Sequence, residues 1–201
     1  MSRCSQQLIG DKEKGLIEML LKPVEIYCEK AGKTITVRSA SMEDIGGILD
    51  IKRDVTANSP YSFYTEDEVP SYNKQMDAVL ELSGGGSSGL IVALVDKTVI
   101  GFCNFKALDR TSRTRHRARI GVEFLDSYTS KGYGTVLFNT VLDIIENLGF
   151  EQVELETVTI NKRAVNMYLK SGFEIAGEIK KAIRLDDATY LDTYLMIKDF
   201  K

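Results

Sequence analysis

The sequence has few of the residues on which much enzyme chemistry depends. Its 201 residues include one histidine, three cysteines, three prolines and no tryptophan. A single histidine excludes a metal site made of several histidines within this chain. Cys4, Cys28 and Cys103 are odd in number and lack the spacing of metal ligands. We therefore expect reduced thiols in the cytoplasm, and neither a disulfide framework nor a metal site.

Long hydrophobic runs and an excess of positive charge are also lacking. The longest purely apolar run, residues 90–95, is too short to cross a bilayer. Residues 1–10 mix charged and polar side chains with apolar ones, so we expect no signal peptide. The 26 basic and 29 acidic residues give a net charge of −3, which does not fit a protein that binds duplex nucleic acid.

Hydrophobic periodicity and turn residues predict a mixed α/β sheet with helices on both faces. Strands are expected at residues 24–29, 34–38, 90–95, 99–108, 115–125, 150–158, 173–179 and 189–197. Helices are expected at residues 11–22, 41–57, 65–82, 132–148 and 161–171. Lys52 falls on the apolar stripe of the second helix, and Pro70 is tolerated in the first turns of the third. The glycine- and serine-rich residues 83–89 predict a flexible loop.

Four arginines alternate before and along the strand expected at residues 115–125: Arg113, Arg115, Arg117 and Arg119. On a regular strand they would share one face. Such a face fits either a solvated hairpin rim or the attraction of an acidic substrate or of phosphate groups.

A polar loop with two glycines, Gly132 and Gly134, leads from that strand into a long amphipathic helix. The first turn of a helix presents unpaired N–H groups and the positive end of its dipole, which suits a pyrophosphate. Glycine lets the backbone approach phosphate oxygens without a Cβ in the way. The loop lacks the third glycine of a dinucleotide fingerprint and the Lys-Ser/Thr pair of a P-loop. Taken alone, it fits a phosphate site and a purely geometric turn equally well.

Asn161 and Tyr168 mark a second motif on the last predicted helix. They are seven residues apart, which places both near one helix face, roughly 10 Å apart along it. Asn161 can therefore line a site at the start of the helix, and Tyr168 can reach the same groove two turns later.

Together the two motifs resemble the signature of the GNAT acetyltransferase superfamily, Gln/Arg-x-x-Gly-x-Gly/Ala followed by Asn-x-x-Ala-x-x-x-Tyr-x-x-x-Gly-Phe. The chain matches it at Gly132, Gly134, Asn161, Ala164, Tyr168, Gly172 and Phe173. It departs at Thr129, where the family usually has Gln or Arg, and at Asp126, where many members have Pro. The resemblance covers residues 34–198 and implies a mixed sheet of about seven strands. We assign residues 1–33 to an N-terminal helix-strand extension and residues 34–201 to the GNAT domain.

The resemblance implies an N-acetyltransferase without a metal. It would transfer an acetyl group from acetyl-CoA directly to a primary amine, either of a small molecule such as an amino acid or polyamine or of a protein N-terminus. The backbone of the preceding strand would hold the pantetheine arm and polarise the acetyl carbonyl, and the loop would hold the pyrophosphate. The residues implied to bind acetyl-CoA are Val122, Glu123, Phe124, Thr129, Ser130, Lys131, Gly132, Tyr133, Gly134, Thr135, Asn161 and Tyr168.

Two of these residues are candidates for proton transfer. Tyr168 matches the tyrosine that protonates the sulfur of CoA in the family, and a phenol with an ordinary pKa of about 10 stays protonated at neutral pH. Glu123 is the candidate base, directly or through water, although the pleat of the strand also allows a solvated glutamate. No cysteine lies in either motif, which argues against a covalent cysteine intermediate.

The alternative function is a non-catalytic acyl-CoA-binding sensor. The pair Asn161 and Tyr168 favours the enzyme, because a sensor needs neither an acid for the thiolate nor an open acceptor groove. The expected partners are acetyl-CoA and a primary-amine acceptor, but neither duplex nucleic acid nor a membrane. An edge strand near the C-terminus would allow a homodimer.

Overall fold

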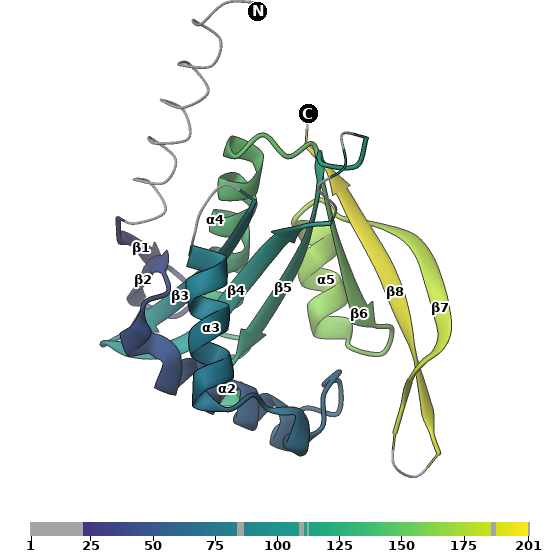
Figure 1. The fold of residues 1–201 in the computed structure, drawn as a ribbon, viewed down its shortest axis with the longest axis horizontal. Coiled ribbons are helices and arrows are strands. Elements are labelled where there is room, and N and C mark those ends of the chain that lie inside the picture. The colour runs from purple at the N-terminus through teal and green to yellow at the C-terminus, as the bar shows by residue number, and fades with distance from the viewer. Residues whose placement is uncertain (1–21, 84–86, 109–110, 112, 186–187, 201) are drawn as a thin grey trace, which may run out of the picture.

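The computed structural model describes residues 22–83, 87–108, 111, 113–185 and 188–200 (Figure 1). Its strands are β1 (Val24–Cys28), β2 (Lys33–Ser39), β3 (Ser88–Val95), β4 (Thr98–Ala107), β5 (Arg117–Phe124), β6 (Gln152–Val158), β7 (Glu174–Arg184) and β8 (Tyr190–Asp199). Its helices are α2 (Ile45–Asn58), α3 (Tyr72–Ser83), α4 (Tyr133–Asn147) and α5 (Lys162–Lys170). The strands form one eight-stranded sheet in the order β1-β2-β3-β4-β5-β6-β8-β7. The predicted mixed α/β fold is confirmed, and its sheet has eight strands where the family resemblance implied about seven.

The helices form a layer on each face of the sheet. Figure 1 shows α2 and α3 in front of the sheet and α4 and α5 behind it. The larger core lies between the sheet and the α4–α5 layer, and the smaller one lies under α2 and α3. β3 is covered on both faces, so every one of its residues after Ser88 is buried.

The parallel pair β5–β6 is the place where the sheet opens and leaves a strand edge free for a ligand. Every other neighbouring pair is antiparallel. The β5–β6 register runs only from Arg117 opposite Gln152 to Arg119 opposite Glu154, after which the two strands diverge (Figure 1). β4 continues to pair with the other edge of β5 as far as Phe124. Within the described chain, residues 120–124 therefore have no strand partner on the side of β6.

A buried carboxylate stabilises the pair at the point where it ends. Glu154 accepts from Nη2 of Arg117 and from Nη2 of Arg119, each at 2.6 Å, and its side chain is 6% exposed. Arg113 and Arg115 lie in the turn before β5. The expected face of four arginines does not form, because only Arg117 and Arg119 are on the strand. Both pair with the single carboxylate of Glu154, which leaves this group of three side chains with one net positive charge.

The prediction of a helix at residues 65–82 is wrong for its first turns. The capping box forms, since the carboxylate of Glu68 accepts from the backbone N–H of Thr65 at 2.9 Å, but it opens only a single 3-10 turn. Proline disfavours the helical region for the residue before it, and Val69, before Pro70, is extended with ψ 123°. α3 begins only at Tyr72.

The predicted loop at residues 83–89 is shorter than expected. Ser83 ends α3, residues 84–86 lie outside the described residues, and Ser88 and Gly89 already belong to β3. Gly89 is needed there for packing, because a Cβ would collide with the ring of Phe105.

The N-terminal strand extends the sheet. β1 pairs with β2 around residues 29–32, as predicted, and Cys28 is buried. The helix expected at residues 11–22 lies outside the described residues except for its last residue, and the domain boundary at residue 34 stays a prediction. β7 is the outer strand at the opposite edge, and the homodimer also stays a prediction. No helix among the described residues is long and apolar enough to span a membrane.

Candidate active site

The loop after β5 is anchored on α2 before it turns into α4. The backbone N–H of Asp126 donates to Oδ2 of Asp54 on α2 at 2.6 Å. The hydroxyl of Thr129 donates to the carbonyl of Asp126 at 2.7 Å, so its side chain holds the loop itself. Ser130 follows with a left-handed φ of 61° and is exposed. These contacts fix the direction in which the chain enters the helix.

The start of α4 presents unpaired donors. The backbone N–H groups of Tyr133, Gly134 and Thr135 have no acceptor within the part of the chain that the structure describes, as expected for the first turn of a helix. A Cβ at Gly134 would lie 3.6 Å from both Phe124 of β5 and Met167 of α5. This end of α4 therefore lies next to the diverging strands and to α5, where an anion would meet three N–H groups and the helix dipole.

The β1–β2 hairpin packs against the same turn from the other side. Gly132 has φ +94°, and a Cβ there would lie 3.1 Å from Sγ of Cys28 and from Cβ of Lys30. The thiol of Cys28 donates to the carbonyl of Lys131 at 3.6 Å. The glycine is thus required twice, by its backbone conformation and by the close approach of the hairpin.

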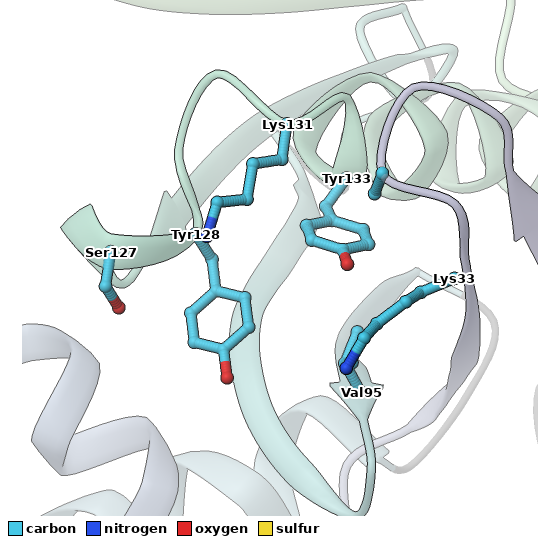
Figure 2. A pocket seen from close by; sticks show the side chains of 7 residues that line it. Lys33, Val95, Ser127, Tyr128, Lys131 and Tyr133 are labelled. Atoms are coloured by element: carbon cyan, nitrogen blue, oxygen red, sulfur yellow. The ribbon is translucent and has the colours of Figure 1, made fainter.

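A cavity of about 440 Å³ lies between the hairpin and the turn. It is lined by Ala31, Lys33, Val95, Ser127, Tyr128, Lys131 and Tyr133. Figure 2 shows Tyr128 and Lys131 on one side of it and Lys33 and Val95 on the other, with the ring of Tyr133 between them. Tyr133 is buried, 6.1 Å from the ring of Tyr128, and Nζ of Lys131 lies 5.2 Å from the centre of the Tyr128 ring. The cavity is therefore on the hairpin side of the turn, not in the gap between β5 and β6.

Tyr168 lies on α5, behind the sheet. Its ring packs 5.1 Å from that of Phe138 and 6.1 Å from that of Phe173, and the residue is 8% exposed. Burial raises the pKa of the Tyr168 phenol, and the thiol of Cys103 adds to the rise, so the group stays protonated. Every fully buried polar side-chain atom of the described residues has a hydrogen-bond partner, whereas the Tyr168 hydroxyl has none among these residues. Its oxygen therefore remains accessible and can act as a donor.

Asn161 caps the helix that carries Tyr168. Its Oδ1 accepts from the backbone N–H of Ala164 at 3.2 Å, the usual bond of an asparagine N-cap. The oxygen is thereby engaged, and the amide nitrogen is the part of the side chain left for a ligand. The spacing of the motif thus combines a capping residue with the phenol two turns later.

Glu123 lies on the opposite face of the sheet from Tyr168. Val122 and Phe124 pack against the core under α4 and α5, whereas the carboxylate of Glu123 points toward α2. Its Oε1 is 3.6 Å from Nζ of Lys52, and its side chain is 25% exposed. Desolvation raises the pKa of Glu123, and Lys52 acts against that rise. Glu123 and Tyr168 can reach a common atom only through the gap between β5 and β6.

Sequence reasoning missed two residues on this face. Lys52 is on the apolar stripe of α2 but contacts Glu123, a pairing that only the tertiary structure shows. Glu156 lies on β6, two residues beyond the last β5–β6 pair, and its Oε1 accepts from the hydroxyl of Thr193 at 2.6 Å. It shares the face of Glu154, and hence that of Glu123, because side chains two apart on a strand point the same way. The sequence does contain a signal for Glu156: it is the second of two glutamates, after Glu154, that alternate with apolar residues along a buried strand.

No cluster of three or more histidine, cysteine, aspartate or glutamate side chains that could hold a metal ion occurs among the described residues. The described residues present a helix N-terminus with free N–H groups, an open strand edge, a protonated phenol on the α4–α5 face of the sheet and two carboxylates on the α2 face. These are groups for binding an anionic ligand and for moving protons beside it.

Comparison with known proteins identifies the family. The model of the acetyltransferase (GNAT) family matches residues 56–173, more than half of the chain, and the chain therefore belongs to this family of N-acetyltransferases. An N-alpha-acetyltransferase of Saccharolobus solfataricus is 28% identical over 87% of this chain and 99% of that protein. The L-amino acid N-acetyltransferase AaaT of Escherichia coli is 29% identical over 54% of this chain and 66% of that protein.

Solved structures share the fold. A GNAT-family acetyltransferase from Streptococcus pneumoniae matches with a TM-score of 0.77 at 20% identity, covering 83% of this chain and 99% of that one. A GNAT-superfamily phosphinothricin acetyltransferase from Sinorhizobium meliloti, in complex with acetyl-CoA, matches with a TM-score of 0.74 at 22% identity, covering 83% and 88%. The expected fold and family are thus confirmed.

Proposed function

We propose that the protein transfers an acetyl group from acetyl-CoA directly to a primary amine, either of a small molecule such as an amino acid or polyamine or of a protein N-terminus. The observation that carries this proposal is the gap between β5 and β6, which opens beside the N-terminus of α4. Two similar proteins, an N-alpha-acetyltransferase and an L-amino acid N-acetyltransferase, are named for acetyl transfer to amines.

The donor would bind through backbone groups. The N–H groups of Tyr133, Gly134 and Thr135 would hold the pyrophosphate, whose charge the dipole of α4 also stabilises. The pantetheine arm would lie along the open edge of β5 at residues 120–124. A backbone N–H of that edge would then donate to the acetyl carbonyl and stabilise the negative charge that develops on its oxygen.

Chemistry would follow in the gap. The amine nitrogen attacks the acetyl carbon, the new C–N bond forms and the C–S bond breaks. The amine gives up a proton to Glu123, directly or through water, and Tyr168 donates a proton to the departing thiolate. Glu156, on the facing strand and on the same face of the sheet, would be a second candidate to accept the amine proton. The products are an N-acetylated amine and free CoA.

The test is Tyr168→Phe, assayed by the release of free CoA thiol with a panel of amines and amino acids. We expect turnover to fall by about 10²-fold or more, because a positioned general acid is removed. Acetyl-CoA affinity, measured by calorimetric titration, should stay nearly the same. Tyr27→Phe, on the exposed surface of β1, is the matched control. Equal turnover of Tyr168→Phe and the wild type would refute the acid role.

The same panel tests the sensor alternative. A non-catalytic module would bind acetyl-CoA in the titration yet release no thiol above background with any amine. Release that depends on the added amine would instead support the transferase, and the amine accepted fastest would define the acceptor class.

A further inference from the structure

Lys52 is an unusual residue for its place in α2. The residues that share its helix face, Ile45, Ile48 and Leu49, are buried in the core under α2. Lys52 itself is 22% exposed along its side chain, and its Nζ lies 5.0 Å from the centre of the Phe102 ring. An ammonium group gains from the face of an aromatic ring and from nearby negative charge, and here it has both. The side chain thus extends from an apolar stripe toward Glu123.

The surroundings of Glu123 offer it no other free cation among the described residues. Arg119, on the same face of β5, is bound to Glu154 of β6. From β4 comes a neutral amide, Asn104, whose Oδ1 lies 2.9 Å from where a Cβ of Gly121 would be. The remaining carboxylates on this side have their own donors.

Two further carboxylates lie on this side of the sheet, and each already accepts a hydrogen bond. Glu156 of β6 accepts from Thr193, and Asp54 of α2 accepts from the backbone N–H of Asp126. Added negative charge and burial both disfavour an ionised carboxylate. Of the described residues, only Lys52 forms an ion pair with Glu123, at 3.6 Å.

We propose that Lys52 is a positioning residue that keeps the Glu123 carboxylate ionised and holds it on the α2 side of the gap between β5 and β6. The inference rests on the proposed function, in which Glu123 accepts the proton of the attacking amine. A protonated carboxyl cannot accept that proton, so a base in a desolvated place needs a nearby cation. The contact is loose enough, at 3.6 Å and partly exposed, for an amine to approach the same carboxylate.

The inference predicts the direction in which the pH dependence of kcat/KM changes when Lys52 is replaced. Lys52 lowers the pKa of Glu123 from the value that burial would impose. Without Lys52 that pKa rises, so the carboxylate is protonated over a wider range of acid pH. The part of the acid limb of kcat/KM that reports the essential base of the free enzyme therefore moves to higher pH, whereas the part that reports the free amine is the same in every variant.

The experiment compares three variants with the wild type across the pH range, using the best amine of the panel. Lys52→Met keeps an unbranched apolar side chain and removes the charge, Lys52→Arg keeps the charge, and Glu123→Gln removes the base. We expect Lys52→Met to move the acid limb upward and to lose about tenfold in kcat/KM for each pH unit of that shift at low pH. The loss should disappear at high pH, where Glu123 is ionised again. Lys52→Arg should keep the limb in place, and Glu123→Gln should abolish the part of it that reports the enzyme base.

The outcomes separate this inference from the function on which it rests. Calorimetric titration with acetyl-CoA confirms that each variant is folded and can bind the donor. An acid limb that stays in place in Lys52→Met, or a Glu123→Gln variant as active as the wild type, would overturn the role of Lys52 while leaving the transferase intact. Loss of thiol release with all amines in the wild type would overturn the transferase itself. If Lys52→Met fails to fold, a limb displaced in Lys52→Gln supports the inference, and an unchanged limb refutes it.

Discussion

Comparing Gly132→Ala with Gly149→Ala separates the effect of backbone strain from the effect on the proposed phosphate-binding turn. Both substitutions strain a left-handed backbone, but only Gly132 lies in that turn. Both glycines have left-handed backbones, with φ +94° at Gly132 and +87° at Gly149. A Cβ at Gly149, just beyond the C-terminus of α4, would meet nothing within 4 Å. A Cβ at Gly132 would lie 3.1 Å from Sγ of Cys28 and from Cβ of Lys30, which is closer than ordinary van der Waals contact.

The strain should affect stability equally at the two positions. A residue with a Cβ pays about 1–2 kcal/mol for the left-handed conformation. Gly149→Ala should therefore lose about that much free energy of unfolding, which corresponds to a fall in Tm of about 2–8 °C for a domain of this size. Gly132→Ala should lose at least as much, because its methyl group also meets Cys28 and Lys30. Circular dichroism during heating measures this loss.

The two variants should differ in acetyl-CoA binding. At Gly132 the hairpin or the turn must move by a few tenths of an ångström to admit the methyl group. If the N–H groups of α4 lose one charge-assisted hydrogen bond to phosphate, worth about 1.5–3 kcal/mol, the Kd rises about 10- to 100-fold. Gly149→Ala should bind acetyl-CoA within about twofold of the wild type. Calorimetric titration checks both values.

A rescue experiment sharpens the comparison. Cys28→Ala removes one of the two close contacts, so the Gly132→Ala, Cys28→Ala double variant should regain part of the lost affinity while keeping the backbone strain. The reasoning is refuted if Gly132→Ala binds acetyl-CoA as tightly as Gly149→Ala, because the turn would then not hold the pyrophosphate.

Two further predictions concern stability. Burial alone would raise the pKa of Asp44, but hydrogen bonds from Arg38, at 2.6 and 2.8 Å, and from Ser41 hold it below its usual range. The carboxylate therefore stabilises the fold above the ordinary pKa of about 4, and this stability is lost as the pH falls through the lowered value. Asp44→Asn should cost about 1–3 kcal/mol at neutral pH in urea unfolding, and the cost should shrink in acid; an equal cost at both pH values would contradict the argument. Asn161→Ala should lose about 1 kcal/mol with the N-cap of α5, whereas Asn161→Asp, which retains an acceptor, should recover most of it in the same assay.

The parts of the fold that the sequence predicted well are those set by local contacts. α4 follows its apolar stripe, and Gly149, with a left-handed φ, ends it as expected. The capping box of Thr65 and Glu68 also forms as predicted. The helix predicted to follow the capping box does not form, because Pro70 excludes Val69 from the helical region and this effect outweighs the favourable cap.

The site was predicted in part, because its motifs are local and its contacts are not. The glycine turn and Tyr168 could be named from two short patterns. Lys52 could not, since a lysine on an apolar stripe gives no sign of the carboxylate that it will meet in another strand. The alternating arginines were likewise ambiguous until the parallel register placed Glu154 between two of them.

The point at which β5 and β6 diverge determines how the proposed reaction can be arranged. Glu154, held by two guanidinium groups, fixes the last pair of the two strands, so the gap begins immediately after it. An unbroken sheet would keep Glu123 and Tyr168 on separate faces with no route between them. Because the strands diverge, a thioester bound in the gap as proposed would face the phenol of Tyr168 from the α5 side and an amine beside Glu123 from the α2 side. Donor and acceptor would then approach from opposite faces and be bound at the same time, which is the arrangement that direct transfer requires and an acetylated enzyme intermediate does not.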